Sequence, residues 1–185
     1  SYTIFDGTSY SSPATVTITF TIPPVGVADQ ITVSEAATAT TLTGGVTSVL
    51  ANDSDSDGDS ITAVLLTNTS YGTLVLNSNG TFSYAHNGSE TTSDTFTYAA
   101  NDGFINGNTV TVTITISPVN DKPTTISDTL YVNEAGTVTL TTSGASNLLA
   151  NDIDPEGDNL TAILVTDPSY GVLLSLIHIS EPTRL

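Results

Sequence analysis

Two short stretches of the chain concentrate acidic side chains in nearly the same pattern. The first reads NDSDSDGD over residues 52–59, and the second reads NDIDPEGD over residues 151–158. The 185-residue chain carries 19 acidic residues but only two basic ones, Lys122 and Arg184. Two carboxylates about 5 Å apart repel each other by roughly 3 kcal/mol at an effective dielectric constant of about 20. We therefore expect each loop either to spread its carboxylates into water or to bind a cation.

The oxygen-rich composition of these loops favours calcium over softer metals. Ca²⁺ takes about six to eight carboxylate and carbonyl oxygens, whereas cysteine, typical of zinc and copper sites, is absent and histidine is scarce. An EF-hand is excluded, because its twelfth position needs a glutamate and the corresponding residues are Val64 and Ile163. A polar turn that binds nothing is the alternative, but the recurrence of the loop favours a metal. The loop ligands that we predict are Asp53, Asp55, Asp152 and Asp154, with Asp57 and Asp59 only shaping the turn.

The two loops belong to a longer internal repeat. Residues 33–72 align without gaps on residues 132–171, at an offset of 99 positions, and about half of the aligned residues are identical. Residues 1–22 match another part of the unit, because YTIFDGTSYSSPATVTITFTI resembles YAANDGFINGNTVTVTITISP farther along the chain. Self-similarity of this kind indicates tandem domains. We predict the C-terminal hairpin of a preceding repeat at 1–22, a complete repeat at 28–117, a linker at 118–123 and the N-terminal half of a further repeat at 124–173.

Strand periodicity dominates the complete repeat. The segment TVTVTITI, residues 109–116, alternates threonine with valine or isoleucine, which gives one buried face and one solvated face. Asn79 and Gly80 suit the positive φ of a tight hairpin turn, and no stretch shows a sustained helical period. Seven short strands in about 90 residues predict an all-β fold of tandem immunoglobulin-like β-sandwich domains. The strands are expected near 30–35, 38–43, 60–67, 72–77, 81–85, 95–100 and 108–117.

The last residues depart from the repeat. After the shared segment SYG the repeat should continue with strand-like alternation, but residues 174–185 contain LSLIHISEPTRL from Leu174 onward, without a turn signal or alternation. The run LSLIHISEPTR resembles the translated read-through of a sequencing adapter. We therefore interpret residues 174–185 as a sequencing artefact and assign no function to His178, Glu181 or Arg184.

The motifs taken together resemble bacterial cadherin-like repeats of the tandem-95 type, found in large secreted adhesins and RTX-type surface proteins. The resemblance rests on the two acidic loops, the SYG and FTYAANDG segments and the linker sequence PVNDKP, and it covers residues 1–173. It implies tandem cadherin-like domains with Ca²⁺ bound at the junctions between them. The junction ligands implied after the complete repeat are Glu35, one of Glu90 and Asp94, the linker residues Asn120 and Asp121, and Asp152 and Asp154 of the next domain. At the other end, Asp53, Asp55 and Asp102 are implied to face the preceding domain.

Charge and motif content exclude several classes of function. A formal net charge of −17 repels nucleic acid and anionic membranes, no apolar run approaches the roughly 18 residues of a membrane span, and no nucleophile elbow or phosphate loop is present. The resemblance implies a non-enzymatic, calcium-stabilised spacer of an extracellular bacterial surface adhesin. Its partners would be neighbouring repeats of the same chain, with any host protein or glycan bound by other domains. The alternative is a calcium-dependent carbohydrate- or protein-binding module, with Tyr10 and Phe104 as exposed aromatic contacts in the hairpin tips.

Overall fold

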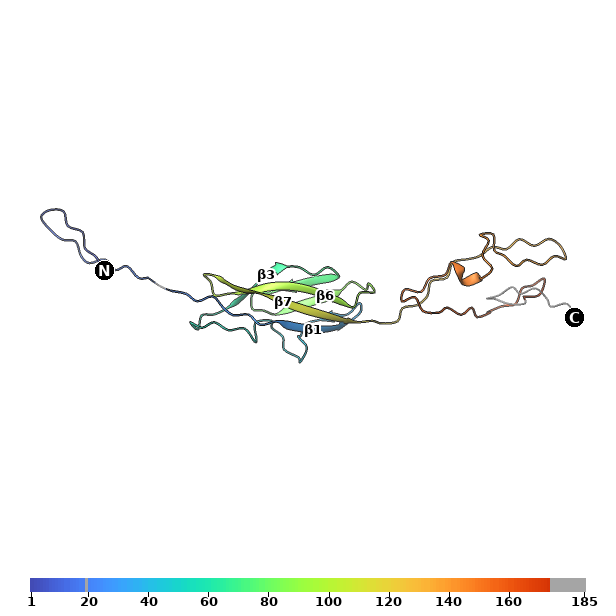
Figure 1. Ribbon diagram of the computed structural model, residues 1–185, viewed down its shortest axis with the longest axis horizontal. Coiled ribbons are helices and arrows are strands. Elements are labelled where there is room, and N and C mark those ends of the chain that lie inside the picture. Colours follow the sequence, from blue (N-terminus) through green and yellow to red (C-terminus); the bar gives the residue numbers. More distant parts are fainter. Residues whose placement is uncertain (19, 174–185) are drawn as a thin grey trace. The chain divides into compact units, whose positions relative to one another are not determined.

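Seven strands form two sheets that pack face to face in the first part of the chain. The computed structural model describes residues 1–18 and 20–173. One sheet has the strand order β1-β7-β6-β3 (Figure 1). The other has the order β2-β5-β4. The strands are β1 (Asp29–Ser34), β2 (Thr38–Ala39), β3 (Thr62–Thr67), β4 (Gly72–Leu76), β5 (Phe82–His86), β6 (Ser93–Asn101) and β7 (Asn106–Ser117). β1 pairs in parallel with β7, and the other pairs are antiparallel. Because two sheets enclose one hydrophobic core, the predicted all-β sandwich is confirmed.

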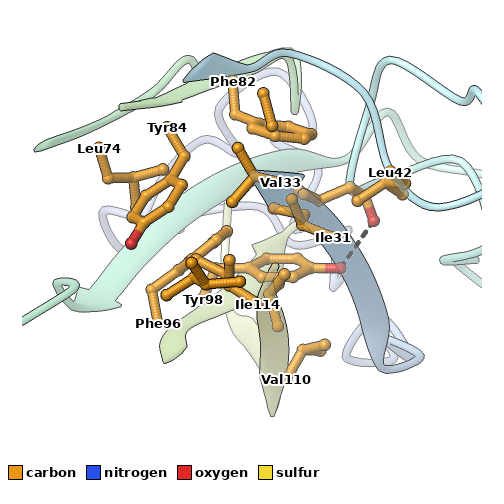
Figure 2. Close-up of a cluster of buried hydrophobic side chains, with 14 residues drawn as sticks. Ile31, Val33, Leu42, Leu74, Phe82, Tyr84, Phe96, Tyr98, Val110 and Ile114 are labelled. Atoms are coloured by element: carbon orange, nitrogen blue, oxygen red, sulfur yellow. Dashed lines mark hydrogen bonds between the residues drawn. The ribbon is translucent and has the colours of Figure 1, made fainter. Parts of the chain in front are cut away.

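Alternation along the strands builds the core between the sheets. β7 buries every second residue from Val110 to Ile116 and exposes the threonines between them. The aromatic rings of the core come from both sheets and belong to Phe82, Tyr84, Phe96 and Tyr98 (Figure 2). The chain has no cysteine, so side-chain packing rather than a disulfide holds the sheets together.

The observed strands agree closely with the predicted ones. Six of the seven predicted ranges end within about two residues of the observed bounds, which is ordinary for strand boundaries. The exception is 38–43, because β2 ends at Ala39. Beyond it the N–H of Leu42 donates to the carbonyl of Val46, and two glycines with positive φ, Gly44 and Gly45, turn the chain. A glycine turn therefore replaces the second half of this predicted strand.

The β4–β5 hairpin requires a glycine at position 80. Gly80 has a φ of 81°, which favours glycine, and a Cβ added there would meet Leu50 Cγ at 2.8 Å. The turn lies at the predicted place, and the N–H of Asn77, which donates to the carbonyl of Thr81, closes it. The close approach of the loop at Gly80 explains why the hairpin needs this glycine.

The chain divides into two compact units, Ser1–Pro118 and Val119–Leu185. In the first unit, residues 1–18 form a hairpin of their own with bridges from Tyr2 to Ala14 and from Phe5 to Tyr10. In the second unit, the described residues contain one bridge, from Thr124 to Ile153, and the short 3-10 helix η1 (Leu148–Ala150). Residues 174–185, interpreted from the sequence as an artefact, lie outside the described residues. No helix in the described part of the chain is long and apolar enough to cross a membrane.

Candidate functional site

Three carboxylates of the first acidic loop converge. Asp55, Asp57 and Asp59 each offer a carboxylate oxygen, and these oxygens lie within 4.8 Å of one another. The loop closes on itself, because Asp55 Oδ1 accepts hydrogen bonds from the N–H groups of Asp57 at 2.9 Å and Asp59 at 3.2 Å. Gly58, with a φ of 80°, makes the tight turn that these bonds require. The result is a small oxygen-lined loop of the kind that holds a divalent cation.

The surroundings of the second carboxylate oxygen of Asp55 show whether these residues suit a cation. Asp55 Oδ2 is buried and accepts no hydrogen bond from the residues that the structure describes. A buried carboxylate oxygen without a partner costs roughly 1–3 kcal/mol or more, and a cation would satisfy it while also neutralising its neighbours. The donor set therefore fits calcium. Asp57 and Asp59, expected from the sequence only to shape the turn, are grouped with Asp55.

Asp53 takes part in a different set of contacts. Its Oδ1 accepts the N–H of Val27 at 2.7 Å, and its Oδ2 accepts the hydroxyl of Tyr98 at 2.9 Å. The neighbouring Asn52 donates from Nδ2 to the carbonyl of Val27 at 3.4 Å and to Asp29 Oδ1 at 3.1 Å. Asn52 and Asp53 thus fasten the loop to the segment that leads into β1, and both oxygens of Asp53 bind protein groups.

A buried carboxyl group lies beside this contact. Asp29, the first residue of β1, is 5 % exposed. The hydroxyl of Tyr98 has three oxygen neighbours: Val49 O at 2.7 Å, Asp53 Oδ2 at 2.9 Å and Asp29 Oδ2 at 3.2 Å. Figure 2 shows the hydrogen bond that Tyr98 makes inside the core. One hydroxyl has one hydrogen to donate, so two of these oxygen–oxygen contacts remain without a hydrogen, and a proton on Asp29 relieves one of the two. Burial raises the pKa of Asp29 to about 6; the hydrogen bond from Tyr98 lowers it in part, and the charge of Asp53 raises it again.

Stability should therefore fall as the pH rises through about 6. The folded pKa of Asp29 exceeds the value of about 3.9 for an unfolded aspartate, so the folded domain binds more protons between these two values. This contribution is fully present below the unfolded pKa and is lost as the pH rises through the folded pKa. Raising the pH from about 5 to about 7.5 should cost about 1.4 kcal/mol. Urea unfolding in calcium-free buffer at fixed ionic strength measures the change.

Asp29→Asn is the matched variant for this prediction. The amide keeps the shape of the side chain but cannot ionise, so the variant should be at least as stable as the wild type at neutral pH. Repulsion among the other carboxylates affects both proteins equally, and the difference between their pH slopes therefore isolates Asp29. Equal slopes in the two proteins would contradict the assignment.

Asp102 organises the β6–β7 hairpin. Its Oδ1 accepts the N–H groups of Phe104 at 2.8 Å and Ile105 at 2.7 Å, and its Oδ2 accepts the hydroxyl of Thr21 at 2.9 Å. The hydrogen bond from the Ile105 N–H is the main cause of the lowered pKa of Asp102. In the hairpin of residues 1–18, Asp6 likewise accepts two backbone N–H groups in its turn. The aspartate of AANDG thus shapes a turn that occurs twice in the chain.

Two glutamates approach each other at the end of β1. Glu35 follows β1 directly, is 7 % exposed and donates its N–H to the carbonyl of Ser117 at 2.9 Å. A carboxylate oxygen of Glu35 lies within 4.8 Å of one of Glu90. Two charges at this separation repel by roughly 3 kcal/mol at an effective dielectric constant of about 20, so a cation would stabilise the pair. Of the two alternatives that the resemblance leaves open, the structure brings Glu90 to Glu35.

Asp94, the other alternative, is surrounded by donors. It is 6 % exposed. Its oxygens accept hydrogen bonds from the N–H groups of Ser70 at 3.0 Å, Tyr71 at 2.8 Å and Thr95 at 2.8 Å and from the hydroxyl of Tyr84 at 3.0 Å. Burial acts to raise the pKa of Asp94, but the hydrogen bonds from the three N–H groups and from the Tyr84 hydroxyl together outweigh it and lower the pKa. Asp94 therefore secures the SYG turn with both of its oxygens.

The second acidic loop repeats contacts of the first at an offset of 99 residues. Asp152 Oδ1 accepts the N–H of Ile126 at 2.8 Å, as Asp53 does from Val27. Asp154 Oδ1 accepts the N–H of Asp158 at 2.9 Å, as Asp55 does from Asp59. The two predicted ligands of this loop thus occupy the same local positions as their counterparts.

The linker residues Asn120 and Asp121 belong to the second unit. The N–H of Asp121 donates to Glu156 Oε1 at 2.6 Å, and Asn120 Nδ2 donates to the carbonyl of Asp121 at 2.7 Å. Glu156 Oε2 is buried and accepts no hydrogen bond from the described residues. The acidic loop of this unit therefore reaches the linker through Glu156, which the sequence did not single out.

Neutral partners of the loop were also missed from the sequence. Tyr98 and Asn52 carry no charge that would mark them as part of an acidic site. The usable signal is recurrence: Asn52 recurs as Asn151 and Asp29 recurs as Asp128 at the same offset of 99. Asn151 Nδ2 again donates to Asp128 Oδ1, at 3.4 Å. A neutral residue that recurs inside an acidic loop therefore predicts a structural contact.

Comparison with family models identifies the class of protein. The model of the bacterial cadherin-like domain matches residues 22–118, just over half of the chain, and that of the bacterial Ig domain matches residues 120–179. The chain belongs to the bacterial cadherin-like family, and the resemblance inferred from its motifs is confirmed. Such domains are typically non-enzymatic repeat modules of surface proteins, and cadherin-like domains generally bind calcium.

Two solved structures are similar to part of the chain. A nucleoside hydrolase-related hypothetical protein from Saccharophagus degradans, associated with carbohydrate metabolism, is 18 % identical with a TM-score of 0.37. The endo-fucoidan hydrolase MfFcnA4 from glycoside hydrolase family 107 is 19 % identical with a TM-score of 0.33. Each match covers 52 % of this chain but only 26 % and 14 % of those chains, respectively. A comparison with curated proteins gives no match.

Proposed function

We propose that this chain is a calcium-stabilised structural repeat of a bacterial surface adhesin. The observation that carries the proposal is the group formed by Asp55, Asp57 and Asp59, in which Asp55 Oδ2 is buried without a hydrogen bond from the described residues. Only two basic residues are present in the whole chain, so the protein itself has little with which to neutralise these groups. Membership of the bacterial cadherin-like family supports calcium as the cation.

A second ion is proposed at the end of β1. Glu35 and Glu90 would supply two carboxylate ligands there, because a carboxylate oxygen of each lies within 4.8 Å of the other. Glu35 is 7 % exposed, so water screens its charge poorly and a cation would stabilise the pair.

The acidic residues would then divide into two roles. Asp55 and its counterpart Asp154 would bind calcium, together with the pair of Glu35 and Glu90. Three further residues predicted from the resemblance as ligands would act as structural acceptors, because both of their oxygens already bind protein groups: Asp53, Asp94 and Asp102. Asp152 has one oxygen engaged in the same way as Asp53.

Calcium should raise the stability of the full chain. Because an ion that binds only the folded form stabilises it by mass action, a hundredfold excess over Kd should add about 2.7 kcal/mol to the free energy of unfolding. Differential scanning calorimetry in calcium and then in EGTA measures the gain and its reversal. A transition temperature that is the same in millimolar calcium and in EGTA would reject the proposal.

Asp55→Asn tests whether calcium binds at this loop or responds only to the overall negative charge of the chain. The variant removes one carboxylate from the loop, so titration calorimetry should show weaker calcium binding there. Ser56→Ala is the matched control, because the neighbouring side chain is exposed and carries no charge. Both variants should keep the far-ultraviolet spectrum of the wild type. Equal calcium affinity in the two variants would remove Asp55 from the ligand set.

A ligand-binding role is the second candidate. Phe104 is 79 % exposed and Tyr10 is 73 % exposed, both in hairpin tips, and exposed rings of this kind can stack against sugars.

Under the main proposal the module acts outside the cell as a spacer, with neighbouring repeats of its own chain as partners. It would then take no part in catalysis, nucleic-acid binding or membrane insertion. Glycan-array binding by this chain in millimolar calcium would favour the ligand-binding role instead.

A further inference from the structure

The contacts shared by the two acidic loops point to a role that does not need calcium. In each unit the loop binds the backbone of the segment that leads into the same domain. This incoming segment comprises residues 22–27 in the first unit and residues 121–126 in the second. We propose that each loop is a clasp that fixes the incoming linker to the domain it enters, whether or not a cation is bound.

The clasp of the first unit holds the incoming segment along its whole length. Its hydrogen bonds, in order along the segment, are Ile22 N–H to Asp57 Oδ2 at 2.7 Å, Val25 N–H to Ser54 O at 2.8 Å, Ser54 N–H to Val25 O at 3.0 Å, Val27 N–H to Asp53 Oδ1 at 2.7 Å and Asn52 Nδ2 to Val27 O at 3.4 Å. Every partner is a residue of the acidic loop. Two of the five acceptors are carboxylates, Asp57 and Asp53, which make stronger hydrogen bonds than neutral groups.

The clasp of the second unit has the same bonds at an offset of 99 residues. They are Asp121 N–H to Glu156 Oε1 at 2.6 Å, Thr124 N–H to Ile153 O at 2.7 Å, Ile153 N–H to Thr124 O at 3.0 Å, Ile126 N–H to Asp152 Oδ1 at 2.8 Å and Asn151 Nδ2 to Ile126 O at 3.3 Å. The same geometry thus occurs in two independent copies.

Differences in sequence between the copies show what the clasp depends on. The acceptor is Asp57 in the first copy and Glu156 in the second, yet each reaches the N–H at the same position of the linker. Ile22 and Asp121 have unlike side chains, and the clasp tolerates the difference because it binds only their backbone N–H groups. A clasp of this kind recognises backbone groups, and it excludes proline at the three linker positions whose N–H is bound, because proline lacks the N–H.

The clasp assigns each linker to the domain that follows it. The family matches begin at residues 22 and 120, at or next to the clasped positions, and the second unit begins at Val119. Flexibility between domains would therefore be confined to residues before Thr21, whose hydroxyl binds Asp102, and to the few residues before Asp121. Asp57 and Glu156 act here as positioning residues, and this role stands independently of the calcium proposal.

Backbone dynamics of the full chain in EGTA test the clasp. The amides of Ile22, Val25 and Val27 should have order parameters near the value of about 0.85 for rigid backbone rather than below about 0.6. Asp57→Ala should lower the order parameter of Ile22 and speed its amide exchange roughly tenfold. The chemical shifts of β6 and β7 should stay unchanged, which shows that the sandwich remains folded.

Matched controls keep this test specific. Asp59→Ala removes a carboxylate from the same loop that takes no part in the clasp, and it should leave the Ile22 amide unchanged. In the second unit, Glu156→Ala should free the Asp121 amide, whereas Asp158→Ala should not. Flexible residues 22–27 in the wild type, or an Ile22 amide that does not respond to Asp57→Ala, would overturn the proposal. Both measurements are made without calcium, so failure of the calcium site leaves them unaffected.

Discussion

Replacing Asp94 with alanine should destabilise the β-sandwich by about 4 kcal/mol, the scale expected when a buried hydrogen-bonded charge is lost. The carboxylate is 6 % exposed and accepts hydrogen bonds from three backbone N–H groups and from the hydroxyl of the fully buried Tyr84. Alanine leaves these four donors without their acceptor, and the hydroxyl of Tyr84 is buried where water does not replace it. Urea unfolding followed by far-ultraviolet circular dichroism measures the loss, since the chain has no tryptophan.

Three comparisons define the cause of this loss. Tyr84→Phe removes one donor and should cost only about 1 kcal/mol, and Asp59→Ala, which removes an exposed carboxylate, should cost little. The pKa of Asp94 is lowered in the folded state, so its contribution is present above the unfolded pKa of about 3.9 and is lost as the pH falls through the folded pKa. The penalty of Asp94→Ala should therefore shrink in strong acid. A penalty that is constant with pH would mean that lost packing, not the charge, is responsible.

The strands were predictable because their signal is local. TVTVTITI alternates in a way that only a half-buried strand satisfies, and β7 has this pattern of burial. The segment 38–43 also has strand-forming residues, but Gly44 and Gly45 turn the chain, and β2 ends at Ala39. Where a glycine turn competes with strand-forming residues, strand propensity alone does not decide the outcome.

The candidate site was predictable only in outline. The acidic loop is plain in the sequence, but the division of labour within it depends on where the incoming backbone runs. Val25 pairs with Ser54, which places the N–H of Val27 beside Asp53 and leaves Asp55 to converge with its neighbours. A sequence shows which residues can bind a cation but not which N–H groups will occupy their oxygens first.

The SYG motif shows the same limit. Its recurrence suggests a packing role for Tyr71, yet this ring is 42 % exposed. The N–H groups of Ser70 and Tyr71 bind Asp94, and a Cβ on Gly72 would meet the backbone carbonyl of Ala85 at 2.6 Å. The contacts of the motif are therefore made by its backbone, and side-chain types alone do not predict them.

Gly107→Ala should cost about 3 kcal/mol, at the upper end of the usual range for overpacking. Gly107 lies in β7 directly against Pro24, which is fully buried. A Cβ added at Gly107 would overlap the carbonyl oxygen of Pro24 and lie 2.9 Å from its carbonyl carbon. These are backbone atoms, and Asn108 holds the adjoining Gly26 by accepting its N–H at 2.9 Å and donating to its carbonyl at 3.0 Å. The substitution must therefore displace the incoming segment from the sandwich.

The sign of this effect decides whether the incoming segment is packed on β7 in solution. If residues 22–27 lay away from the strand, alanine would fit, and the loss of a glycine would stabilise the domain by about 0.4–1 kcal/mol. Thr109→Ala is the control, because it adds no atom and changes an exposed residue of the same strand. Urea unfolding of the three proteins gives the sign, and amide exchange at Val25 and Val27 should accelerate in Gly107→Ala alone. Because the overlap involves the backbone of Pro24, enlarging a neighbouring side-chain space would not rescue the variant, and only movement of the linker itself can relieve it.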